Sequence, residues 1–177
     1  MDKLTRLDRL CFLIEEAGGR VDGRKKLHKL AYLCERGGTD LGQGFVFYMY
    51  GVYSPSLAQD VSAAQAWEYI TEESDPAGDK YEISLGSKGR EHHSVIPDLE
   101  QAGLQLVGNL ARESASVLEV VTTIAYLWDS GYREPKLREK LTDLKGHLSF
   151  HFEHAFDLVN RYGLCEEARL STVRTGV

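Results

Sequence analysis

Residues 23–38 read GRKKLHKLAYLCERGG, and residues 45–61 read FVFYMYGVYSPSLAQDV. In the first stretch Leu27, Leu30, Ala31 and Cys34 recur at helical spacing, which predicts a helix with one apolar stripe. Asp22 stands where an N-cap is expected, and the two glycines at 37 and 38 end the pattern. The basic residues fall beside the apolar stripe, so we expect a helix with a buried face and a charged face.

The second stretch predicts a strand and a further helix. Phe45 to Tyr50 is short and aromatic and lies between Gly44 and Gly51, which is typical of a strand. Ser54 and Pro55 then supply an N-cap and a proline at the first helical position. We expect the helix to run over residues 55–67.

The flanking sequence extends this pattern. Leucines at helical spacing predict a helix over residues 4–17. Residues 68–72 and 80–85 are strand-like and are separated by turn residues, so we expect a β-hairpin. Three helices followed by a hairpin is the element order of a winged helix, with the hairpin as the wing.

The second half is predicted to be helical throughout. A short helix starts at Ser87, and a longer one covers residues 99–110. Ser116 and Glu119 have the spacing of a capping box at the start of an apolar helix, and two further helices are expected from Pro135 and over residues 147–162. The predicted fold is therefore mainly α with a small β component: a winged-helix-like half (1–90) packed on a C-terminal helical bundle (91–167). The two halves share one core, and residues 168–177 form a flexible tail.

Charge is unevenly distributed along the 177 residues. The net charge is −6, whereas a domain that mainly binds phosphate is usually basic. Residues 20–36 carry six basic and two acidic side chains, and residues 40–82 carry eight acidic side chains and one lysine. No apolar run approaches the roughly 18 to 20 residues of a membrane span, no leader is expected at the N-terminus, and three widely spaced cysteines favour a reducing cytoplasm.

The basic helix offers the first candidate site. Lys25 and Lys29 are four residues apart and are expected on one face, with Arg24 and His28 in a neighbouring row. This face is interpreted either as a solvated surface or as a dock for an acidic partner. Helix 55–67 contains no lysine or arginine, and the hairpin is acidic, so base reading of DNA is disfavoured.

The tyrosine-rich turn is the second candidate. Tyr48 and Tyr50 are two residues apart and are expected on one face of a strand, while Gly51 permits a sharp exit. With the N–H groups of the following helix they could form a recognition pocket, or they could pack that helix onto the sheet. The candidate binding residues are Arg24, Lys25, Lys29, Tyr32, Tyr48, Tyr50, Gly51, Tyr53 and Ser54.

Other chemistry is weakly indicated. His147, His151 and His154 fall on one face of the predicted last helix, where neighbouring pairs could share a metal, but an exposed polar face is the alternative. The ends of this row lie about 10 Å apart by helical rise, so one ion cannot hold all three. The sequence has no nucleophile elbow, P-loop or dinucleotide fingerprint. We expect no catalytic residues, no cofactor and no metal.

Several of these motifs resemble a known family. RKKLHKLAYL (24–33), the tyrosine turn through Leu57, the YEISL stretch (81–85) and LEVVTTIAYLWDSGY (118–132) are similar to the YwgA-like proteins and to the related Panacea domain of antitoxins and phage-associated proteins. This chain has Val52 where that pattern commonly has proline. The resemblance implies a compact helical fold, a prokaryotic toxin–antitoxin or mobile-element setting and, for Panacea antitoxins, binding of a toxin.

These observations favour a non-catalytic module that recognises a protein, with a toxin as one candidate partner. The alternative is a winged-helix DNA-binding regulator, and an enzyme is the third choice. A membrane partner is not expected, and a homodimer is left open.

Overall fold

The computed structural model describes residues 1–74, 81–92 and 101–166. In chain order its elements are α1 (Lys3–Glu16), β1 (Arg20–Asp22), α2 (Gly23–Arg36), β2 (Val46–Tyr48), β3 (Gly51–Tyr53), α3 (Pro55–Ala66), β4 (Ile70–Ser74), β5 (Tyr81–Leu85), α4 (Ser87–His92), α5 (Gln101–Leu110), α6 (Ala115–Asp129), α7 (Lys136–Lys145), the 3₁₀ helix η1 (Gly146–His151) and α8 (Phe152–Arg161). The fold is mainly helical with a small antiparallel β component, which confirms the predicted class.

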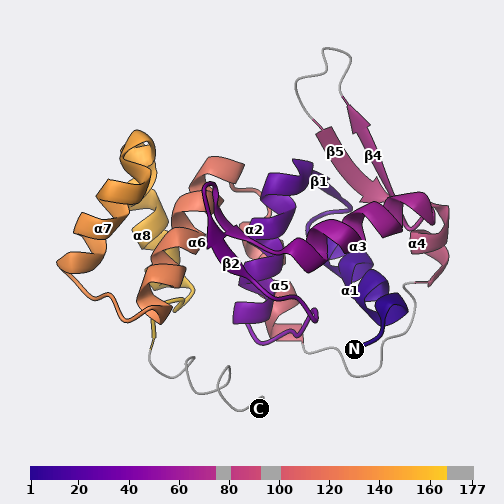
Figure 1. Cartoon of the computed structure of the whole chain (residues 1–177), viewed down its shortest axis with the longest axis horizontal. Coiled ribbons are helices and arrows are strands. Elements are labelled where there is room, and N and C mark those ends of the chain that lie inside the picture. The colour runs from indigo at the N-terminus through magenta and orange to yellow at the C-terminus, as the bar shows by residue number, and fades with distance from the viewer. Residues whose placement is uncertain (75–80, 93–100, 167–177) are drawn as a thin grey trace.

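Two small sheets accompany the helices (Figure 1). One sheet has the strand order β1–β5–β4. In it Ile83 of the central strand β5 lies between Val21 of β1 and Glu72 of β4. β2 and β3 form a separate hairpin. α1, α2 and α3 precede the β4–β5 hairpin in the predicted order, but the β2–β3 hairpin is inserted between α2 and α3.

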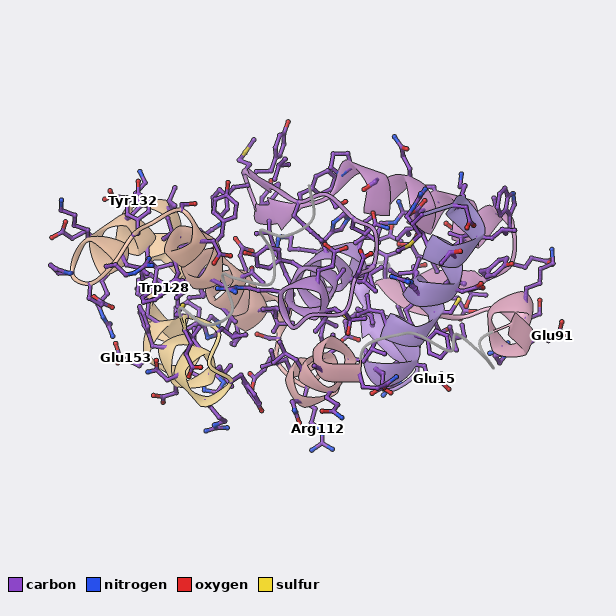
Figure 2. All side chains as sticks on the ribbon, turned by 90° about the horizontal axis from the view of Figure 1, so that it is seen from below. Glu15, Glu91, Arg112, Trp128, Tyr132 and Glu153 are labelled. Atoms are coloured by element: carbon purple, nitrogen blue, oxygen red, sulfur yellow. The ribbon has the colours of Figure 1, made fainter. Side chains whose placement is uncertain are left out.

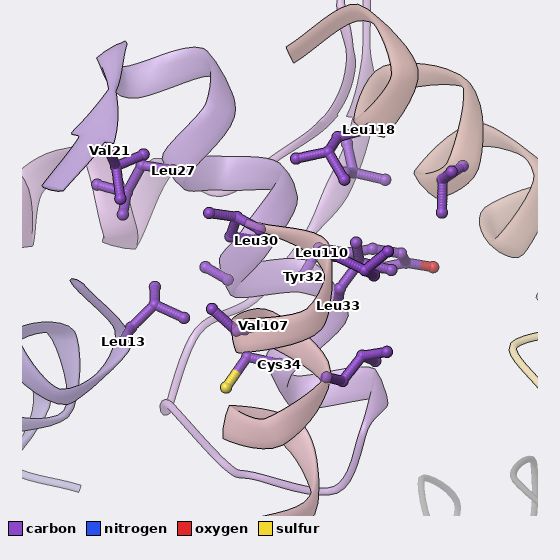
Figure 3. Packing of buried hydrophobic residues seen from close by; sticks show 14 of the residues in the cluster. Leu13, Val21, Leu27, Leu30, Tyr32, Leu33, Cys34, Val107, Leu110 and Leu118 are labelled. Atoms are coloured by element: carbon purple, nitrogen blue, oxygen red, sulfur yellow. The ribbon is translucent and has the colours of Figure 1, made fainter. Parts of the chain in front are cut away.

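α2 lies at the centre of the molecule. Every residue from Lys26 to Cys34 is buried, and the helix contacts α1, α5, α6 and the strands β1, β3 and β5. Figure 3 shows its leucines between Leu13 of α1, Val107 of α5 and Leu118 of α6. One buried hydrophobic cluster runs from α1 to α8, so the described parts of both predicted halves share a core. Glu91 of α4 lies at one end of the molecule and Tyr132 at the other (Figure 2). The predicted halves are not separated along this axis, because α5 of the second half packs against α1 and α2.

A close crossing of α2 and α5 depends on glycine. A Cβ on Gly103 would lie 2.0 Å from the carbonyl oxygen of Cys34 and 2.7 Å from Oγ1 of Thr39. The Gly103 N–H donates to that same Oγ1 at 3.1 Å. From sequence, Gly103 looks like a weak point in a helix, yet here it allows two backbones to approach.

The strand predicted over residues 45–50 is wrong in extent. β2 ends at Tyr48, Met49 and Tyr50 form a turn, and Gly51 begins β3 instead of leading directly into a helix. Tyr48 and Tyr50 therefore do not share one strand face. β1 was not predicted, because three residues are too few to show an alternating pattern.

Two helix boundaries also differ. α6 begins at Ala115 with Ser114 as its N-cap, whose Oγ accepts from the Val117 N–H; the predicted capping box of Ser116 and Glu119 is wrong. The predicted helix 147–162 is a 3₁₀ turn followed by α8, with non-helical backbone at Leu148. Asp22 precedes α2 as expected but makes no side-chain cap.

The predicted tail lies outside the described residues, as does the turn between β4 and β5. Among the residues that the structure covers, none of the helices combines the length and apolar character that crossing a membrane requires.

Candidate functional site

The β2–β3 hairpin, residues 46–53, displays large apolar side chains to solvent. The exposed fractions are 66% for Tyr48, 78% for Met49 and 62% for Tyr50, and Val46 and Tyr53 are also exposed. We call these five side chains the hairpin patch. Apolar side chains gathered on one short segment are typical of interaction sites.

The inner side of the hairpin is packed against the helices. Val52 is fully buried. The Phe47 ring lies 4.9 Å from the Tyr126 ring of α6, and the Phe45 ring, just before β2, meets Tyr32 of α2 edge-on at 5.4 Å. The hairpin is therefore anchored on α2 and α6 (Figure 1), while the side chains of its patch are exposed to solvent.

Lys29 anchors the hairpin by its backbone. Its Nζ donates to the carbonyl oxygens of Tyr50 at 2.8 Å and Val52 at 2.7 Å. The side chain is 2% exposed, which corrects the prediction that Lys29 and Lys25 share an open basic face. Burial lowers the pKa of Lys29 to about 8, although the nearby Glu119 carboxylate opposes this. A lysine in this place binds backbone rather than a partner.

His28 makes a second contact of the same kind. Its Nδ1 accepts from the Ser54 N–H at 3.2 Å, and its ring stacks on Tyr53 at 4.6 Å. Burial lowers the pKa of His28 to about 4, so the ring is neutral at pH 7 and Nδ1 is free to accept. Together, His28 and Lys29 occupy the outer edge of β3, where another strand would otherwise pair.

Gly51 closes the turn above a polar cluster. Its φ is +86°, a conformation that glycine adopts without strain. A Cβ here would lie 3.5 Å from Nζ of Lys29 and 3.7 Å from both Cγ of Glu119 and Oγ1 of Thr123. The glycine was predicted to be needed for its backbone freedom, and its positive φ confirms that.

Beneath the hairpin lies a buried ion pair that the sequence did not reveal. Nζ of Lys145 is 2.5 Å from Oε1 of Glu119, and the side chains are 2% and 7% exposed. The Lys145 ammonium also lies over the Phe47 ring at 5.9 Å. The two residues are 26 positions apart and belong to α6 and α7, so no local spacing pointed to them.

The predicted basic patch is largely neutralised. Arg24 bonds to Glu72 at 2.7 Å, and Arg36 bonds to Asp129 at 2.8 Å. Arg20 and Lys26 lie 3.6 Å and 3.5 Å from carboxylates of Glu82 and Asp22. Lys25 has no carboxylate within ion-pair distance among the described residues, and its Nζ lies 4.7 Å over the Tyr50 ring. Lys25 is thus the cation that extends the hairpin patch.

Two other candidate binding residues, Tyr32 and Ser54, are buried and stabilise the fold. Tyr32 is 9% exposed and donates its hydroxyl to Asp129 at 3.3 Å, and burial raises its pKa. Ser54 is fully buried, and its Oγ accepts from the Leu57 N–H to cap α3. Neither side chain lies on the surface, so these two residues and Lys29 support the site, whereas Lys25, Tyr48, Tyr50 and Tyr53 form it.

The histidine row does not exist as predicted. His147 and His151 lie in η1 and His154 in α8, and Nε2 of His154 pairs with Glu113 at 2.9 Å. No group of three or more histidine, cysteine or carboxylate side chains within the described ranges could hold a metal ion.

The chain is similar to the uncharacterized protein YwgA of Bacillus subtilis (strain 168), with 26% identity over 133 residues, covering 72% of this chain and 76% of YwgA. This similarity supports the YwgA-like resemblance seen in the motifs. No family model matches the chain.

Proposed function

We propose that this protein is a non-catalytic binding module that recognises another protein through the hairpin patch and Lys25. The observation that carries this proposal is the exposure of Tyr48, Met49 and Tyr50 on a hairpin whose inner side is fixed by buried contacts. The turn is held in place before any partner arrives, so little ordering entropy is lost on binding.

The chemistry of the patch suits protein recognition. Tyrosine combines a rigid apolar ring with a polar hydroxyl and is enriched among residues that dominate interface energies. Lys25 adds a positive charge at the edge of the patch. No residue between Leu41 and Gln59 is charged, so Lys25, which has no carboxylate partner among the described residues, gives this surface its preference for a carboxylate.

Co-purification from cells at native expression tests the proposal. Tyr50→Ser is compared with Tyr81→Ser, because Tyr81 is similarly exposed, at 54%, but lies on β5. Loss of an interface hot spot costs about 2 kcal/mol or more, or roughly 30-fold in affinity. A partner lost only from the Tyr50→Ser sample is expected. Equal recovery with both variants would contradict the proposal.

The proposed setting is the prokaryotic cytoplasm, in a toxin–antitoxin, phage or mobile-element system. The Panacea-like motifs suggest a toxin as the partner. We expect a small toxin-like reading frame beside the gene. We also expect the wild-type protein, but not Tyr50→Ser, to rescue cells that express this toxin. A partner with no toxicity would remove this part of the proposal.

A DNA-binding regulator of the winged-helix type is the alternative. It is supported by the order of α1, α2, α3 and the β4–β5 hairpin. It is opposed by an α3 without basic residues and by Glu72 and Glu73 on β4, which phosphate would repel. A gel shift on the gene's own upstream DNA tests this alternative. It is run at low salt, where binding to phosphate is strongest, and the absence of a complex would contradict the alternative.

A further inference from the structure

The free edge of the hairpin suggests which kind of partner the patch accepts. Antiparallel residue pairs alternate between hydrogen-bonded and non-hydrogen-bonded types. Phe47 lies opposite Val52, and the Val52 carbonyl points out of the hairpin, because it accepts from Lys29. The Phe47–Val52 pair is therefore of the non-hydrogen-bonded type. The N–H and C=O of Phe47 must then point away from β3.

The two edges of the hairpin differ accordingly. The β3 edge is occupied by Lys29 at the Val52 carbonyl and by His28 at the Ser54 N–H. At the β2 edge, no hydrogen-bond partner of the Phe47 backbone occurs among the described residues. Val46 and Tyr48 flank this edge with exposed side chains. An open edge of this kind is a template for another strand.

We infer that the partner contributes an extended segment that adds to β2 as a third strand. The inference rests on the proposed function and deepens it. Backbone hydrogen bonds at Phe47 would give affinity, and alternate apolar side chains against Val46 and Tyr48 would give specificity. Lys25 lies over the Tyr50 ring at the turn that joins β2 to β3, and residues 42–58 carry no charge, so we expect a segment that carries a carboxylate where it passes the turn.

A second copy of this chain fits the edge less well. Symmetric pairing of two β2 strands around Phe47 would form the same two backbone bonds as a partner's segment, so charge distinguishes the two. Each copy carries a net charge of −6, which opposes association.

The test uses a blocked peptide of alternating valine and threonine with one aspartate, and amide hydrogen exchange followed by NMR on the full chain. Binding is expected to slow exchange of the Phe47 N–H at least about tenfold. The same peptide with methylated backbone nitrogens is the control and should not bind. A peptide that binds without protecting Phe47, no binding at all, or Phe47 protection that grows with protein concentration alone would each overturn the inference.

Charge is tested separately. Lys25→Gln should weaken binding of the aspartate peptide about five- to tenfold but leave an asparagine version unchanged, whereas Lys136→Gln, an exposed lysine on α7, should affect neither. Equal loss with both peptides would contradict the carboxylate assignment. If Tyr50→Ser still abolishes co-purification while Phe47 stays unprotected in the captured complex, strand addition fails and the proposed function stands.

Discussion

Glu119 and Lys145 form an ion pair that is almost removed from water. Removal of one partner leaves the other charge buried without compensation, which costs about 3 to 5 kcal/mol. Glu119→Leu should therefore lower the free energy of unfolding by that amount in urea titrations. The double variant with Lys145→Met should recover most of the loss, because two apolar groups of similar size replace the pair.

Glu113→Ala provides the comparison for this experiment. The Glu113–His154 pair is partly exposed, and exposed pairs contribute less than about 1 kcal/mol. A similar small loss for Glu119→Leu and Glu113→Ala would show that the buried pair is not a stabilising contact.

His28 gives the fold a specific pH response. The pKa of this ring is about 4 in the folded chain, against about 6.5 in an unfolded one. Between these values the unfolded chain binds a proton that the folded chain does not, so stability falls as pH falls. From pH 7 to pH 5 the wild type should lose about 2 kcal/mol more than His28→Gln. Parallel pH profiles of the two proteins in urea titrations would contradict this.

For single residues, the sequence predicts where the basic side chains cluster but not which carboxylates they pair with. The six basic side chains of residues 20–36 are evident by inspection, but their partners Glu72, Glu82 and Asp129 come from distant elements. Lys29 has the same spacing from Lys25 as an exposed pair would have, and only the packing of the hairpin over α2 buries it. The basic residues therefore cluster as the sequence predicts, but fewer of them are exposed and unpaired than the sequence suggests.

At the scale of elements, Lys29 should decide whether the hairpin stays on α2. Lys29→Met keeps the apolar stem but removes the donors to the Tyr50 and Val52 carbonyls. We expect a loss of at least about 2 kcal/mol. The amides of Gly51 and Tyr53 should exchange faster than those of α6, because the hairpin is released locally.

Lys26→Met is the matched control. Lys26 is also buried, but within the described parts of the chain its Nζ has one hydrogen-bond partner, the exposed carboxylate of Asp22 at 3.5 Å, so the loss should stay below about 1 kcal/mol. Uniform exchange throughout the Lys29→Met protein would mean that this lysine does not hold the hairpin.

The α2–α5 crossing gives a second element-level prediction. Gly103→Ala places a methyl group against the Cys34 carbonyl, and such overpacking costs about 1 to 3 kcal/mol. Gly108→Ala in the same helix meets its nearest atom, the Glu16 carbonyl oxygen, at 3.4 Å, and should be neutral or stabilise by up to about 1 kcal/mol because alanine favours helices. Thermal unfolding of both variants tests this, and two equal shifts would contradict it.

Element length explains which predictions succeeded. α1, α2, α3 and α6 each span three turns or more, and their apolar periodicity predicted them. β1, β2 and β3 have three residues each, too few for a period. The irregularity lies inside η1, where Leu148 departs from helical backbone. No proline or glycine stands beside Leu148, so an apolar pattern that continued across it predicted one helix.

At the scale of the whole molecule, α2 joins the two ends. It contacts α1 and β5 towards one end and α6 towards the other, and the β2–β3 hairpin lies over this junction (Figure 1). The side chains of the hairpin patch are exposed. The sequence indicated the tyrosine turn as a candidate site, and Lys25, Tyr48, Tyr50 and Tyr53 remain exposed there. The anchoring by Lys29 and His28 and the ion pair beneath required the three-dimensional pairing of α2, α6 and α7.

Site-specific photocrosslinking in living cells tests the binding proposal most directly. A benzophenone amino acid replaces Met49 at the tip of the hairpin or, as the control, Phe150 in η1; these side chains are 78% and 76% exposed. If the hairpin patch binds a partner, position 49 should yield one discrete crosslinked protein that is absent from position 150 and lost when Tyr50→Ser is added. No crosslink from position 49, or the same adducts from both positions, would contradict it.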